Sequence, residues 1–199
     1  MNDLLEVSRR WVKEKYSNAE HLLKTEEWLR RIDPAASEPM LLAALTHDME
    51  RAFPGPDSPK QDPLLGPDDP VYNRAHSERS ARVVSDFLRE QQTPEALIEE
   101  VAGLIQVHEV GGWPEADRVQ VADSLSFLEV NVGLFLCMLD RPGGWTLDTV
   151  RAKFDWMYER IRLPEARRLA EPLYETALER LREKEQAMLS AREEGGKDG

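Results

Sequence analysis

Four histidines and two aspartates are the residues of this chain best suited to bind metal ions. The 199-residue sequence has four histidines, and an aspartate directly follows the second of them. Imidazole nitrogens and carboxylate oxygens are ligands of divalent Fe, Mn, Co, Ni and Zn. Helical bundles build such sites from side chains on facing helices. The candidate ligands, in chain order, are His21, His47, Asp48, His76, His108 and Asp123.

The apolar pattern around these residues turns them toward a core. In the predicted helix over 37–51, Asp48 lies on the stripe of Leu41 and Leu45, at helical spacing. Asp123 lies on a predicted helix that is apolar nearly all round. A buried ionised carboxylate needs a metal, an arginine or a hydrogen-bond network. A single inward histidine is more often a hydrogen-bonded core residue, but six inward residues of these types together favour a metal centre.

Four segments surround these residues: LLAALTHDMER, NRAHSERSARVVSDFL, IQVHE and ADSLSFLE. With their order along the chain, they resemble the HD superfamily of metal-dependent phosphohydrolases, whose pattern is H…HD…H…H…D on an all-helical core. The resemblance covers roughly residues 17–135. It implies a first metal bound by His21, His47, Asp48 and Asp123, and a second held by His76 and His108 with Asp48 as the bridge. A four-ligand form with one metal would leave His76 and His108 as pocket residues.

The cofactors implied by this six-ligand form are two divalent ions, with Fe or Mn expected first and Co, Ni, Zn or Mg as alternatives. Two cations about 3.5–4 Å apart lower the pKa of a bridging water and neutralise phosphoryl oxygens. We therefore expect hydrolysis of a phosphate ester of a small metabolite or nucleotide, with Asp48 in the catalytic set.

Two arginines are expected to join the catalytic set by binding substrate. Arg51 lies one turn after His47, and Arg79 lies three residues after His76, so each could lean over the metals. Ordinary surface arginines are the alternative interpretation. Glu50 and Glu109 also adjoin predicted ligands, but neighbouring helix positions face about 100 degrees apart, so we expect both glutamates to be exposed.

The resemblance does not specify the substrate. Arg51 stands where some nucleotidase members of the superfamily have a glutamate, and the GYP motif of the cyclic-dinucleotide phosphodiesterases is missing. A second hypothesis is a diiron oxygenase of the myo-inositol oxygenase type, which uses a similar set of six ligands. Those enzymes usually bring a lysine or another histidine close to the HD pair, and HDMER offers neither. A third hypothesis is a helical binding module with an inactive site, which would have no physical reason to keep six buried ligands.

Helices are predicted almost throughout, because apolar residues recur at helical spacing and no stretch alternates as a strand does. The chain is predicted to be all-α, an HD-domain-like bundle over residues 1–162 with a charged C-terminal helix and frayed tail over 163–199 packed on it. Six prolines between 54 and 70 predict a surface loop that could form a lid. The predicted helices span roughly 3–16, 17–32 with a capping box at its start, 37–51, 73–91, 93–108, 115–139, a segment from 146, and 164–192.

Composition limits the possible partners. The chain has 26 Lys and Arg against 38 Asp and Glu, a net charge of −12, so we expect no nucleic-acid binding through a broad basic face. The longest charge-free apolar stretch, 130–139, is shorter than the about 20 residues of a membrane span. The single cysteine, Cys137, cannot form an internal disulfide, which favours a cytoplasmic protein. The charged C-terminal helix could pack on the body or on a second copy, as a homodimer.

Overall fold

The computed structural model describes residues 3–62, 65–141 and 145–195. Within these ranges the chain is helical and contains no strand, which confirms the predicted all-α class. The α-helices are α1 (Leu4–Lys15), α2 (Ala19–Ile32), α3 (Glu38–Thr46), α4 (Pro70–Glu90), α5 (Glu95–Gln106), α6 (Pro114–Ser126), α7 (Val132–Met138), α8 (Leu147–Glu159) and α9 (Pro164–Gly195). A short 3₁₀ helix, η1 (Met49–Ala52), follows α3, and a π-helical segment, η2 (Phe127–Asn131), joins α6 to α7.

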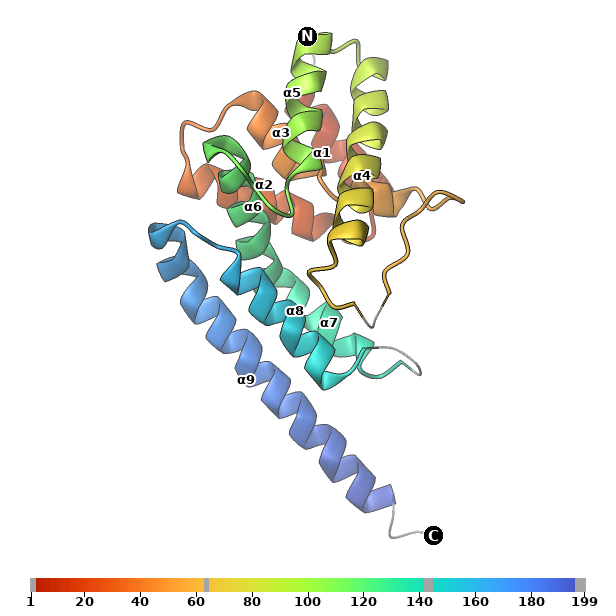
Figure 1. Cartoon of the computed structure of the whole chain (residues 1–199), viewed down its shortest axis with the longest axis vertical. Coiled ribbons are helices and arrows are strands. Elements are labelled where there is room, and N and C mark those ends of the chain that lie inside the picture. The colour runs from red at the N-terminus through yellow and green to blue at the C-terminus, as the bar shows by residue number, and fades with distance from the viewer. Residues whose placement is uncertain (1–2, 63–64, 142–144, 196–199) are drawn as a thin grey trace.

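The helices form two groups that meet along α6. Helices α1 to α5 lie together in one group, and α7, α8 and α9 form the other, with α6 passing between them (Figure 1). Helix α3 is the core helix of the first group, because its residues from Met40 to Thr46 are all buried. A helix that is apolar on all sides is expected to be enclosed by others. The C-terminal end of α3 therefore lies in the interior of the protein.

The predicted helix over 37–51 ends earlier than expected. Helix α3 stops at Thr46, and the backbone turns at His47 and Asp48 before η1 begins. Thr46 Oγ1 donates a hydrogen bond to the Leu42 carbonyl at 2.7 Å, a local bond that competes with regular helix at a terminus. Because of this turn, two adjacent residues can face the same site, which a straight helix would not allow.

The start of α2 also differs from the prediction. The capping box proposed at residues 17–20 does not form, because the N-cap is Asn18 and its side chain makes no capping hydrogen bond. Asn18 Nδ2 instead donates to Asn131 Oδ1 at 3.0 Å. This bond ties the start of α2 to η2, where the predicted continuous helix over 115–139 changes its winding. Short π-helical segments are often found at functional sites.

The stretch Pro114–Met138 is long and apolar enough to cross a membrane by length and composition, but 61% of its 18-residue apolar window is buried inside the protein. Its buried residues include Val119, Ala122 and Leu125 in α6 and Phe127 in η2. Burial in a bundle accounts for this apolar composition, as in the core helices of soluble proteins.

The C-terminal segment is a helix, as predicted, and it runs to Gly195. Helix α9 lies alongside α8 and then extends past it (Figure 1). Its buried residues are Ala166, Ala170, Ala177 and Leu181. The predicted frayed tail falls partly on residues 196–199, which lie outside the described residues, whereas 193–195 are helical.

Candidate metal centre

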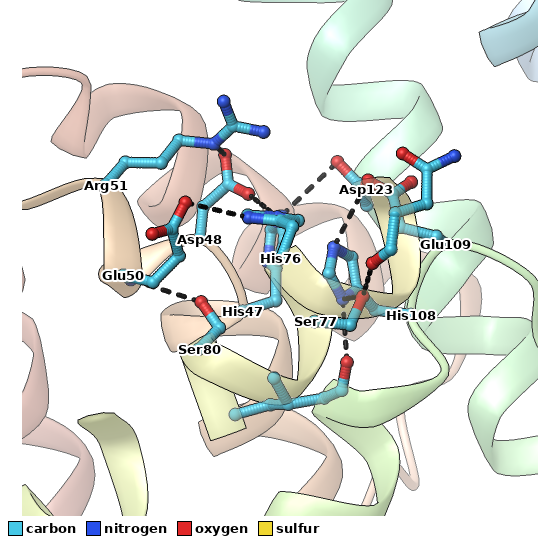
Figure 2. A network of polar contacts seen from close by, with 12 residues as sticks. His47, Asp48, Glu50, Arg51, His76, Ser77, Ser80, His108, Glu109 and Asp123 are labelled. Carbon is cyan, nitrogen blue, oxygen red and sulfur yellow. Dashed lines mark hydrogen bonds and ion pairs between the residues drawn. The ribbon is translucent and has the colours of Figure 1, made fainter. Parts of the chain in front are cut away.

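The six predicted ligands converge at one buried place between the two helix groups. They come from α2, the turn after α3, α4, the turn after α5, and α6. Three overlapping groups have ligand atoms within 4.8 Å of one another: His21, His47 and Asp48; His47, His108 and Asp123; and Asp48, His76 and His108. Residues far apart in the sequence thus form one cluster that could hold metal ions. Figure 2 labels His47, Asp48, His76, His108 and Asp123 of this cluster.

Each of the four histidines uses Nδ1 for a hydrogen bond inside the protein. His47 Nδ1 donates to the Ala44 carbonyl at 3.0 Å and His108 Nδ1 to the Ile105 carbonyl at 2.7 Å. His76 Nδ1 donates to Glu50 Oε1 at 3.0 Å. His21 Nδ1 lies 2.9 Å from Ser126 Oγ, whose own proton is donated to the His21 carbonyl. Because a carbonyl or carboxylate acceptor requires Nδ1 to carry a proton, these bonds place the lone pair on Nε2 whenever the ring is neutral.

The Nε2 atoms are therefore the atoms that could bind a metal, and most of them lack a hydrogen bond. The Nε2 atoms of His47, His76 and His108 are buried and make none in the described part of the chain. Buried polar atoms without a hydrogen bond are rare. Histidines that bind a metal typically donate the N–H of their other ring nitrogen to a protein acceptor, as Nδ1 does in these four histidines. The donor set therefore fits divalent metal ions.

The two aspartates occupy different places in the cluster. Asp123 Oδ1 lies 3.1 Å from His21 Nε2 and 3.4 Å from His47 Nε2. Asp48 Oδ1 lies 2.8 Å from His76 Nε2, and Asp48 also belongs to the group with His21 and His47. Asp48 thus stands between two sets of imidazoles, the position that the resemblance assigns to a bridging carboxylate.

The charges of the metal-free cluster compensate one another. Burial disfavours a charged His47, but Asp123 outweighs burial and raises the pKa of His47 to about 9. For His108 burial prevails and lowers the pKa to about 4. Burial alone would raise the pKa of both aspartates, but Arg51 beside Asp48 and Arg160 beside Asp123 hold each pKa well below its usual range. In the metal-free protein, protonated His47 supplies positive charge that a metal ion would supply in the metal-bound protein.

Glu50 is buried, contrary to the expectation that it would be exposed. It is only 5% exposed, because the turn after α3 brings it toward α4 instead of solvent. Glu50 accepts from His76 through Oε1 and from Arg79 Nη1 through Oε2, both at 3.0 Å. It is a carboxylate partner that orients His76, one of the candidate ligands.

Arg79 was expected to lean over the metals, and the structure places it elsewhere. Its guanidinium donates to the Glu50 and Phe53 carbonyls at 2.9 and 2.7 Å, and pairs with Glu50 and Asp57. Arg79 does not line the pocket beside the cluster. It therefore positions Glu50, and through Glu50 it positions His76, instead of lying over the candidate ligands as predicted.

Glu109 is also buried rather than exposed, and its partner is an arginine that sequence reasoning missed. Arg160, at the end of α8, donates to the carboxylates of Glu109 and Asp123 and, through Nε, to Ser124 Oγ at 2.8 Å. Burial raises the pKa of Glu109, but Arg160 outweighs burial and lowers it to about 2. No spacing in the sequence links Arg160 to Asp123, because they lie on different helices.

A pocket of about 110 Å³ opens beside the cluster. Asp48, Asp123 and His21 form part of its wall, and Arg51 lies in it as expected. The described residues of the loop over 53–69 do not line it, so they form no lid there; Pro63 and Leu64 of the predicted lid lie outside the described residues. The remaining lining residues are Tyr16, Asn18, Glu109, Phe127, Asn131, Leu134, Phe135, Met138, Lys153, Met157 and Arg160.

The centre is therefore defined by its own geometry: six inward ligands, four imidazoles held by Nδ1, and a pocket beside them with cationic side chains. Glu50, Glu109 and Arg160 complete the surroundings of these ligands. Comparison of the chain with family models, curated proteins and solved structures finds no match.

Proposed function

We propose that this protein is a metal-dependent phosphohydrolase of the HD type, which cleaves a phosphate ester of a small molecule. The observation that supports this most strongly is the set of buried imidazole Nε2 atoms that face two carboxylates in one cluster, those of His47, His76 and His108 making no hydrogen bond in the described structure. The proposed ligands are His21, His47, Asp48 and Asp123 for one divalent ion, and His76 and His108, with Asp48 shared, for a second. Fe or Mn is the expected metal.

Divalent ions held there would supply an activated water and neutralise the charge of a phosphoryl group. The chain's own residues provide the orientation. Asp48, held by Arg51 Nε at 3.2 Å and near Tyr16 Oη at 3.4 Å, keeps its carboxylate between the imidazoles. In the described structure the terminal nitrogens of Arg51 have no hydrogen bond or ion pair. Figure 2 shows them pointing away from Asp48, so they are available to a phosphate oxygen.

The same pocket keeps the diiron oxygenase as the second candidate. A lysine near the centre was expected of such an enzyme and is missing from the segment around His47, but Lys153 of α8 lines the pocket. Lys153 lies far from His47 in the sequence, so inspection of the residues around His47 could not identify it. Phosphate release and oxygen uptake distinguish the two activities.

The test is a phosphate-release panel of nucleotides, sugar phosphates and simple esters with the protein loaded with Mn, Fe, Co or Mg. We expect release that depends on metal and is lost in Asp48→Ala. An Asp86→Ala protein is the matched control, because Asp86 is exposed and lies outside the pocket. Iron-dependent oxygen uptake with an organic substrate, without phosphate release, would contradict the proposal and favour the oxygenase.

A further inference from the structure

We propose that Lys153 and Arg51 together bind the anionic group of the substrate, and that this substrate is a small phosphomonoester with a short apolar body. The inference rests on the proposed function and adds the substrate class. It follows from the unpaired cations of the pocket, its apolar wall and its size.

Lys153 is an ammonium group with no carboxylate in direct contact among the described residues. Within the described residues its Nζ makes no hydrogen bond or ion pair, and it lies over the rings of Trp156 and Phe127 at 4.3 and 5.4 Å. Lys24 and Lys184 on the surface are both paired with carboxylates. Burial lowers the pKa of Lys153 to about 8, against the opposing effect of Glu109, so the charged form still prevails at neutral pH. A charge partly withdrawn from water without a partner is costly, and an anionic ligand would offset this cost.

Arg51 supplies the second cation from a different element. It lies on η1 and Lys153 lies on α8, and both line the pocket that contains Asp48 and Asp123. Arg160 also lines this pocket, but Glu109, Asp123 and Ser124 occupy its donors. Arg160 is therefore engaged in holding the cluster, whereas Arg51 and Lys153 have donors to spare. Donors from two separate elements can hydrogen-bond to different oxygens of one phosphate group.

Part of the lining of the pocket is apolar. It is formed by Leu134, Phe135 and Met138 of α7, with Met157 of α8 and Phe127 of η2. Leu134 is 41% exposed, so its side chain is accessible to a ligand in the pocket. A substrate with an apolar body next to its phosphate would cover this side chain and gain from the burial.

The size of the pocket limits that body. Its volume is about 110 Å³, whereas pockets for drug-sized ligands hold about 300–1,000 Å³. A nucleoside monophosphate would extend out of this space, whereas a phosphate with a short alkyl chain or one aromatic ring is much smaller. The pocket therefore favours simple alkyl and aryl phosphomonoesters over nucleotides.

The first test compares four probes with the metal-loaded protein: n-butyl phosphate, phenyl phosphate, glycerol phosphate and adenosine monophosphate. We expect kcat/KM for butyl and phenyl phosphate to exceed that for the other two by at least about tenfold. Equal use of butyl and glycerol phosphate, or preference for adenosine monophosphate, would overturn the substrate class and leave the phosphohydrolase in place. Release of phosphate from none of a broad panel of esters would instead refute the phosphohydrolase itself, and the inference with it.

The second test removes the charge of Lys153. Lys153→Met keeps the apolar stem against Trp156 and Phe127, and we expect KM for phenyl phosphate to rise about 10- to 100-fold with metal content unchanged. Lys153→Arg should restore most of the loss, and Lys184→Met is the surface control. An unchanged KM in Lys153→Met, or a loss of bound metal equal to the loss of activity, would overturn the assignment of Lys153 to the substrate.

Discussion

Replacing Glu50 by alanine tests whether the residues around the ligands set the affinity of the centre. In the folded protein Glu50 accepts the Nδ1 proton of His76 and is itself held by Arg79. The substitution leaves that buried Nδ1 without an acceptor, and frees the His76 ring to turn its Nε2 away from the cluster. Loss of such a partner typically weakens metal binding 10- to 100-fold, which is about 1.4–2.7 kcal/mol.

The stability of the metal-free protein should fall as well. One buried donor without a partner costs about 1–3 kcal/mol, and Arg79 keeps its bonds to two carbonyls and to Asp57. Glu50→Gln retains an oxygen that can accept from His76 but loses the charge, so we expect a smaller effect on both quantities. Glu78→Ala is the control, because Glu78 pairs with Arg74 at the surface of the same helix, where such pairs contribute little.

Calorimetric titration of the chelator-treated proteins with Mn²⁺ measures the affinity, and far-ultraviolet circular dichroism checks that helicity is kept. The expected order of affinity is wild type and Glu78→Ala first, Glu50→Gln next and Glu50→Ala last. Wild-type affinity in a folded Glu50→Ala protein would refute the role given to Glu50 and Arg79.

Three further outcomes follow from the same geometry. Because the pKa of His47 is raised from 6.5 to about 9 in the metal-free protein, its contribution to stability is fully present below pH 6.5 and is lost as pH rises through 9. Metal binding must displace that proton, so affinity should rise by up to about tenfold per unit between pH 6 and 8; affinity that is constant with pH would contradict this. Arg160→Met leaves Glu109 and Asp123 without their arginine and should destabilise the metal-free protein by about 3–5 kcal/mol, with part of this loss recovered when metal is added. Denaturant unfolding with and without Mn²⁺ measures the loss and the recovery. An unchanged midpoint would contradict the role of Arg160 as the partner of these two carboxylates. Gly111→Ala should lower the free energy of unfolding by about 1–3 kcal/mol, as measured by thermal unfolding. Gly111 has φ of +70°, and an added Cβ would lie 2.2 Å from Asp117 Oδ1. A variant as stable as the wild type would show that this turn relaxes.

The ligand set could be predicted from the sequence because each of its members sits on or beside an apolar stripe. Helical spacing indicated that Asp48 and Asp123 face inward, and it needed no knowledge of how helices pack. The same spacing failed at Glu50, because it assumed a straight helix where the chain turns after Thr46. A difference of a few residues in the end of one helix thus reversed the predicted exposure of a side chain next to the centre.

The partners of the ligands could not be predicted, because they depend on packing between distant elements. Arg160 lies 37 residues from Asp123 and Lys153 lies in another turn of α8, and both look like ordinary charged residues of an amphipathic helix. Arg79 shows the opposite error: its position near His76 suggested a substrate contact, but its side chain extends toward Glu50 and Asp57. Sequence spacing shows which residues share a face, and the tertiary fold decides what that face meets.

The central claim is that the imidazoles and carboxylates of this cluster hold divalent ions. It is tested most directly by the metal content of the purified protein after reconstitution with Mn²⁺ or Fe²⁺ and removal of free metal. Elemental analysis should find about two ions per chain, with a clear loss in His47→Ala and Asp48→Ala proteins that remain helical. A wild-type protein that retains no stoichiometric metal, or variants that retain as much as the wild type, would contradict it.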